Sequence, residues 1–286
     1  MRSLPPFTGI TGYRRKNYEK NTGLFFRIRF IHGLQYRAAA LSGIVTQFIW
    51  GTMELLLFRA FYEAAPESFP MEFQALSTYI WLQQAFLALY MTWFWEAELF
   101  QSITTGNVAY ELCRPVRLYH MWFTRSLAVR LSKAVLRCMP ILLFAWLLPA
   151  PYGLALPGNI HTWFFYPFVH DPGASFCGCL WYGGIHVRFF YTISSQGIKL
   201  IVTSLSEFLS GAAIPLPFLP DGIREFVNFL PFASAQNVPF RIFGGDLKGY
   251  DMYASLLGQV FWLAVFLVIG QVMERGALKR LVIQGG

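Results

Sequence analysis

Long apolar stretches separated by short polar links dominate the pattern of this chain. A helix that crosses a bilayer needs about 20 mostly apolar residues, and lipid offers backbone groups no hydrogen-bonding partner, so such stretches predict membrane-spanning helices. The fourth stretch is the least regular, because His170-Asp171-Pro172-Gly173 interrupts it. The pattern predicts six spans, at residues 38–61, 78–100, 128–148, 161–184, 195–214 and 252–272.

Three segments beside these spans predict shorter helices. Residues 24–31 mix aromatic side chains with arginines, which is typical of an amphipathic helix lying in the membrane interface. Residues 104–115 predict about two helical turns, because Thr104 or Thr105 can cap a helix start and a proline follows. Residues 215–251 contain five prolines among apolar pieces, which predicts short helices dipping into the outer interface. The predicted fold class is therefore an all-α membrane protein.

Positive charge is distributed unevenly over the predicted links. The head, the link between spans 2 and 3, the link between spans 4 and 5 and the tail are basic, whereas the link between spans 1 and 2 is acidic. Lysine and arginine favour the cytoplasmic side, so both termini are expected there. The predicted organisation is a cytoplasmic head at 1–37, a six-span transmembrane domain at 38–272 and a cytoplasmic tail at 273–286.

The composition supports a membrane environment. Hydrophobic residues make up 55% of the chain and charged residues 13%, about half the charged share of soluble domains, which is about 25%. The net charge of +8 does not predict nucleic-acid binding, because the basic residues cluster at the ends of apolar stretches instead of forming one patch. Lipid is thus the expected solvent of most of the surface.

No catalytic motif is visible in the sequence. It has no H-E-x-x-H and no G-x-S-x-G, and its five histidines are scattered without ligand spacing. We therefore predict no catalytic residue, bound cofactor or metal for this chain. The phosphate-binding loop G-x-x-x-x-G-K-[ST] is also missing, so another chain must supply the motor if transport is driven by ATP.

Polar residues inside the predicted spans require an explanation, because each costs about 2.5–3.5 kcal/mol on insertion scales. Glu54 falls in span 1 and Glu207 in span 5, while Arg130, Lys133 and Arg137 form one stripe on span 3. Two interpretations are open. These residues line a seam that faces a partner subunit or a substrate path, or they pair between helices and fix their packing.

The segment after span 5 carries a motif. It reads S-G-A-A-I-P-L-P-F-L-P from Ser210 to Pro220 and L-P-F-A over 230–233. This pattern resembles that of ABC type-2 exporter permeases, in which it lies in outer re-entrant helices. The resemblance assigns an outer re-entrant motif to Gly211, Pro215, Pro220 and Pro231.

A second segment carries the same resemblance. The run Y-E-L-C-R-P over 110–115 is similar to the coupling segment between spans 2 and 3 of this family. Within the short predicted helix, Val108 and Leu112 give an apolar side and Glu111 and Arg114 a charged one. We expect the apolar side to bind a groove on an ATPase. The resemblance assigns ATPase coupling to Val108, Tyr110, Glu111, Leu112, Arg114 and Pro115.

The resemblance covers residues 24–160 and 190–286. The start at 35–38 and the end at 277–286 also resemble one bacterial subgroup of these permeases. Residues 158–188 depart from it, because the family has a smooth apolar fourth span there; either the span is broken or the reading frame is altered locally. Residues 1–20 look like an extension beyond the family start.

The resemblance implies a half-transporter in the bacterial cell membrane. The chain would form the translocation path with a second permease chain, a related chain being favoured over a second copy. Separate cytoplasmic ATPase subunits would bind ATP and Mg²⁺. Drugs, peptides, lipids and glycans are all compatible substrates. Alternatives from other classes are a non-transporting membrane scaffold or immunity protein and a membrane-embedded enzyme that modifies lipid.

Overall fold

The computed structural model describes residues 13–91, 98, 101–102, 105, 107–114, 118–156 and 196–280. All regular structure in these ranges is helical. The predicted fourth span at 161–184 and the proline at 115 lie outside them. The helices are α1 (Tyr13–Leu34), α2 (Arg37–Ala64), η1 (Pro66–Ser68), α3 (Phe73–Tyr90), α5 (Val108–Leu112), α6 (Leu118–Leu147), α8 (Gln196–Leu209), η2 (Leu216–Phe218), α9 (Asp221–Phe229), α10 (Asn237–Phe243) and α11 (Gly249–Arg280).

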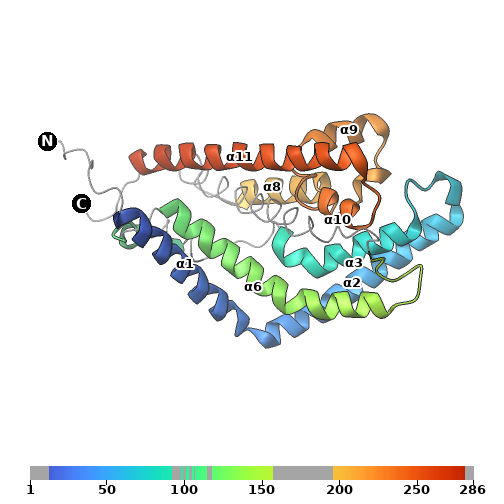
Figure 1. Ribbon diagram of the computed structural model, residues 1–286, viewed down its shortest axis with the longest axis horizontal. Helices are drawn as coiled ribbons and strands as arrows, with labels where there is room; N and C mark the ends of the chain where they lie inside the picture. The colour runs from blue at the N-terminus through green and yellow to red at the C-terminus, as the bar shows by residue number, and fades with distance from the viewer. Residues whose placement is uncertain are drawn as a thin grey trace, which may run out of the picture.

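Helices α2, α3, α6 and α11 run back and forth along the length of the molecule, and α1 meets the start of α2 at a sharp bend (Figure 1). The N-terminal end of α1 and the C-terminal end of α11 lie at one end of the molecule, while η1, α9 and α10 lie at the other. Helix α1 packs along α6, and α6 also packs against α2 and α3. The expectation that both termini lie on the cytoplasmic side stays a prediction.

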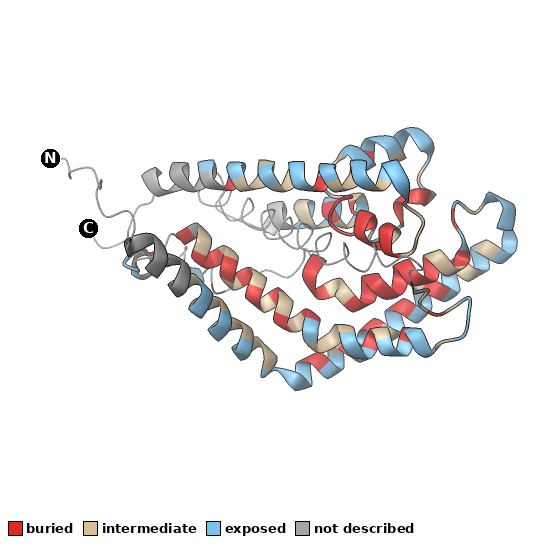
Figure 2. Ribbon diagram, viewed as in Figure 1, coloured by how far each residue is buried: buried red, intermediate tan, exposed pale blue. Residues whose placement is uncertain are grey.

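Burial shows which helices face outward. Figure 2 shows buried residues along α3, α6 and α10 and exposed residues along α2 and α11. Among the described residues, two segments are long and apolar enough to cross a membrane: α2 and residues 249–270 of α11. Both keep large apolar side chains on their surface, such as Trp50 and Phe261. Surfaces of this kind need lipid or a protein partner to cover them.

The predicted spans 1, 5 and 6 overlap α2, α8 and α11, but three predicted boundaries, in spans 2 and 3, differ substantially from the structure. Helix α3 covers Phe73–Tyr90, so span 2 begins five residues earlier and ends ten residues earlier than predicted. Helix α6 begins at Leu118, ten residues before the predicted start of span 3. Apolar runs alone misplaced both ends, because the polar residues of α3 and the basic residues of α6 face other helices. The six-span arrangement stays a prediction.

The segment between α8 and α11 is broken into short pieces, as its prolines indicate. Helix α8 ends at Leu209, where Gly211 adopts a φ of 83°; glycine is the residue that reaches this left-handed region without strain. Pro215 and Pro220 then precede η2 and α9 directly. Helix α10 packs against α3, so this segment folds back onto the core of the molecule.

Candidate functional site

Helix α5, the predicted coupling segment, is attached to the start of α6. The indole Nε1 of Trp122 donates a hydrogen bond to the carboxylate of Glu111. The guanidinium of Arg114 lies 3.7 Å from the sulfur of Met121. A helix of five residues is not stable alone, so these contacts with α6 fix where it lies.

The outward side of α5 differs from the predicted one. Val108 is buried within the chain, whereas the side chain of Tyr110 is 76% exposed. The apolar docking side expected from Val108 is therefore wrong, and Tyr110 is the large side chain available to a partner. The side chain of Leu112 lies outside the described part.

The start of α5 also differs from the prediction. Asn107 precedes the helix without a side-chain cap. The hydroxyl of Thr105 donates instead to the carbonyl of Gln101, so capping by Thr105 is wrong, and Thr104 lies outside the described residues. The contact between Glu111 and Trp122, instead of a cap, holds this short helix in place.

Arg130 explains why α3 ends where it does. Its side chain is almost fully buried, and its Nη1 donates to the carbonyl oxygens of Leu89, at 3.0 Å, and Met91, at 2.9 Å. The last carbonyls of a helix have no partner within the helix and carry its negative dipole end. A cation from α6 thus satisfies the end of α3, which makes Arg130 a packing residue rather than part of an outward seam.

The intramembrane candidate Glu54 faces the interior of the same chain. The amide of Gln84 on α3 lies 3.4 Å from its carboxylate. One turn and a half further along α2, Arg59 pairs with Glu63 at 2.6 Å and lies over the ring of Tyr152. Glu54 therefore has a partner on a neighbouring helix, which supports the packing interpretation for this residue.

The other two intramembrane candidates lie on α6 and α8. The guanidinium of Arg137 lies on the bare backbone of Gly43 on α2, where an added Cβ would be 2.5 Å from its Cζ. Its Nη2 lies 3.5 Å from the carbonyl of Ala39. Glu207 lies half-buried on α8. The structure brings Glu54, Arg137 and Glu207 to three separate places.

The outer motif packs on α3. The hydroxyl of Tyr79 donates to the carbonyl of Gly211 at 3.0 Å, and the amide of Gln83 donates to the carbonyl of Ala212 at 2.8 Å. A Cβ at Gly211 would lie 2.8 Å from the Tyr79 hydroxyl. The glycine of the motif thus serves both a turn and a close contact.

Several residues of these contacts were not singled out by sequence reasoning. Tyr79 and Gln83 are polar positions in an otherwise apolar run, and Trp122 precedes the predicted start of span 3. Arg125 of α6 forms an ion pair with Glu98, beyond the end of α3. The hydrogen bond from Arg125 and the positive charge of that side chain hold the pKa of Glu98 below its usual range, and the charge of Arg29 contributes. The polar side chains of Tyr79 and Gln83 inside an apolar run were the signal in the sequence that could have pointed to these contacts.

The comparisons with known proteins identify a family. A family model described as ABC-2 family transporter protein matches residues 48–285, which include most of α2, the coupling segment and the outer motif. No curated protein and no solved structure matches this chain. In the part that the structure describes, no group of three His, Cys, Asp or Glu side chains could hold a metal ion. The chain therefore belongs to the ABC-2 transporter family and is a membrane permease component of an ABC transporter.

Proposed function

We propose that this chain is the permease subunit of an ABC exporter, driven by separate ATPase subunits that bind α5. It would form the translocation path together with a second permease chain. The observation that carries the proposal is the state of α5: Glu111 holds it on α6 while Tyr110 points away from the chain. A subunit without its own phosphate loop needs such a contact to receive motion from a motor.

The long helix α6 makes α5 suitable for this role. It begins six residues after α5 ends and continues for 30 residues. It contacts α1, α2 and α3. A displacement of α5 would therefore reach α1, α2 and α3 through one long helix.

Copurification and ATP turnover test the proposal. The exposed aromatic ring of Tyr110 is expected to be a central contact of the interface, since buried tyrosines are frequent hot spots. Tyr110→Asp should reduce both the amount of ATPase that copurifies and its turnover, by about tenfold or more for a contact of about 2 kcal/mol. Membrane insertion should be unchanged, because the residue lies outside the apolar helices.

The matched control is Tyr250→Asp. Tyr250 is also highly exposed. It lies in the first turn of α11, and the C-terminal end of α11 lies at the opposite end of the molecule. This control should leave copurification and turnover at the wild-type level. The proposal fails if Tyr110→Asp leaves copurification and turnover at the level of the control. The purified chain without the ATPase subunits should show no ATP turnover.

A further inference from the structure

Glu54 lies at the border between the buried and the exposed side of α2. On a helix, side chains three and four positions apart are neighbours. Trp50 and Leu57 stand in this relation to Glu54 on one side and are exposed. Gly51 and Phe58 stand in it on the other side and are buried. The carboxyl group therefore lies where the contact between α2 and α3 meets an apolar surface.

The contact between α2 and α3 beside Glu54 is close and offers few polar partners. An added Cβ at Gly51 would lie 3.0 Å from Cγ of Gln84, so this side chain lies against the backbone of α2. Gln47, one turn before Gly51, is buried, and neither atom of its amide has a partner among the described residues. In such surroundings a charge is costly. The apolar side chains that pack here include Leu55, Phe58, Ile80, Trp81 and Ala85.

The carboxyl group of Glu54 has one weak hydrogen bond. Nε2 of Gln84 lies 3.4 Å from Oε2, beyond the usual range of hydrogen-bond distances. Oε1 is buried and has no partner among the described residues. In the same part of the chain Glu54 forms no ion pair, and Arg59, the next cation on α2, pairs with Glu63. A carboxylate here would carry a charge that almost nothing compensates.

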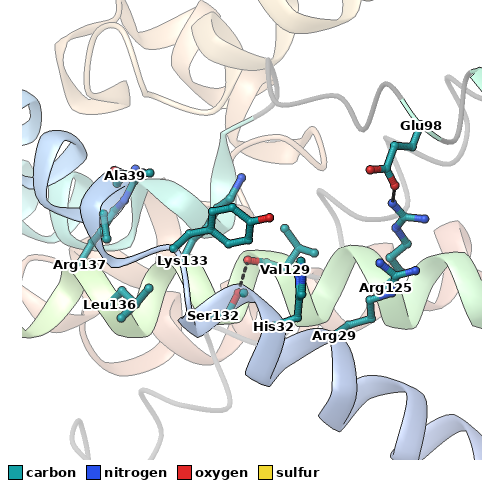
Figure 3. A pocket seen from close by; sticks show the side chains of 13 residues that line it. Arg29, His32, Ala39, Glu98, Arg125, Val129, Ser132, Lys133, Leu136 and Arg137 are labelled. Carbon is teal, nitrogen blue, oxygen red and sulfur yellow. Dashed lines mark hydrogen bonds and ion pairs between the residues drawn. The ribbon is translucent and has the colours of Figure 1, made fainter.

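The elements that pack on α2 are α3, α6 and η1. Helix α3 contains no charged residue, and its titratable group within electrostatic range of Glu54 is the hydroxyl of Tyr79. On α6, Arg137 lies beside Ala39 near the start of α2 (Figure 3). Its guanidinium lies against Gly43, about 16 Å from Glu54 along the helix axis. The other titratable groups on α2 after Glu54, on α6 after Arg137 and on η1 are Arg59, Tyr62, Glu63, Cys138 and Glu67.

We propose that Glu54 is a proton-binding site within the membrane and holds a proton at neutral pH. A neutral carboxyl group avoids the cost of a charge between two apolar helices. The proton would lie on Oε2 and be donated to the amide oxygen of Gln84, because an amide that is turned over presents its oxygen where its nitrogen was. Oε1 would then be a carbonyl oxygen, whose burial without a partner costs far less than that of a charged oxygen.

A protonated carboxyl group beside an apolar surface should react with an apolar carbodiimide. The proton moves to one nitrogen of the reagent while a carboxyl oxygen bonds to its central carbon, which gives an O-acylisourea. The acyl group then moves from that oxygen to the other nitrogen, which gives a stable N-acylurea. No group leaves, so the mass rises by that of one reagent molecule. A carboxylate lacks the proton that the first step needs.

Infrared spectroscopy tests the proton directly. The full chain, purified with the subunits that accompany it, would be compared at neutral pH with Glu54→Gln, which keeps the shape of the side chain and removes the acid. The difference spectrum should contain the C=O stretch of a protonated carboxyl group in the wild type, replaced by an amide band in the variant. A difference spectrum that contains carboxylate bands instead would overturn the proposal.

Two further variants locate the hydrogen bond. Gln84→Leu should move the C=O band of the acid to higher wavenumber, because the hydroxyl of Glu54 loses its acceptor. Gln47→Leu changes a buried amide on the same helix side that has no contact with the acid, so it should leave the band in place. If Gln84→Leu leaves the band in place as well, Gln84 is not the acceptor.

Chemical labelling needs no variant. The wild-type complex would be treated with dicyclohexylcarbodiimide at pH 7 and analysed by mass spectrometry of its peptides. Glu54 should be labelled at least about tenfold more than Glu63, which is exposed and paired with Arg59, since an ordinary glutamate is only about 0.2% protonated at this pH. Labelling of Glu54 should fall as the pH is raised.

Equal labelling of Glu54 and Glu63 would overturn the placement of a protonated group at the apolar surface. Labelling that does not change with pH would do the same. Neither the infrared band nor the label depends on ATP turnover, so these outcomes are independent of whether α5 couples to an ATPase.

Discussion

At the scale of single residues, Arg130 shows how a charge can belong to the core of a membrane protein. It is buried in α6 and donates to two carbonyls at the end of α3. Hydrogen bonds to charged groups contribute about 1.5–3 kcal/mol each, and their loss leaves the carbonyls unsatisfied. We expect Arg130→Met to lower the stability by about 3 kcal/mol.

The loss of stability in Arg130→Met would be measured as a fall in the apparent unfolding temperature in detergent. Arg130→Lys should fall between the wild type and Arg130→Met, because it keeps the charge at the helix end but has a less suitable donor geometry. A stability of Arg130→Met equal to that of the wild type would show that the two carbonyls find other partners.

Gly211 makes a second prediction at this scale. Its φ is 83°, and an added Cβ would lie 2.8 Å from the hydroxyl of Tyr79. Gly211→Ala should destabilise the protein by about 1–3 kcal/mol, through backbone strain and this contact. Gly222→Ala, in α9 with open space around it, should be neutral or slightly stabilising. Combining Gly211→Ala with Tyr79→Phe should recover part of the loss, and unfolding temperatures of all four proteins check it.

At the scale of elements, the hydrogen bond between Glu111 and Trp122 helps to hold α5 on α6. Trp122→Phe removes the indole donor to Glu111 but leaves the exposed Tyr110 unchanged. We expect the ATPase to copurify while its turnover falls about fivefold, the factor for a contact of about 1 kcal/mol. Trp146→Phe, at an exposed position near the other end of α6, is the control. If both variants turn over ATP equally, the contact does not position α5.

Some helices were predictable from the sequence, and the ends of others were not. Helices α2 and α11 were predictable, because exposed apolar helices in lipid have long uninterrupted apolar runs. Helix α3 was predicted with wrong ends, because its limits depend on Arg130 and on polar side chains that bond to the turn at Gly211. The exposed side of α5 was also wrong, because the burial of Val108 depends on how the chain folds around it. Contacts between residues that are far apart in the sequence leave no pattern in the sequence around either residue.

At the scale of the whole molecule, the alternating direction of the helices predicts a topology. Element η1 and the start of α11 lie at the end of the molecule opposite to the C-terminal end of α11 (Figure 1). Reporter fusions at residues 68 and 248 should therefore report the outer side, and a fusion after residue 286 the cytoplasm. Residues 68 and 286 on the same side of the membrane would contradict the predicted even number of spans.

The attachment of α3 at two points has a mechanical consequence. Arg130 holds one end of the helix, and Tyr79 holds the turn at Gly211 ten residues away, a separation of about 15 Å along the helix axis. Between these points α3 is a stiff rod attached to α6 at one end and to the turn at Gly211 at the other. A tilt imposed on α6 should therefore move the turn at Gly211 with it. Stiffness would then be concentrated along the line from α6 through α3 to this turn.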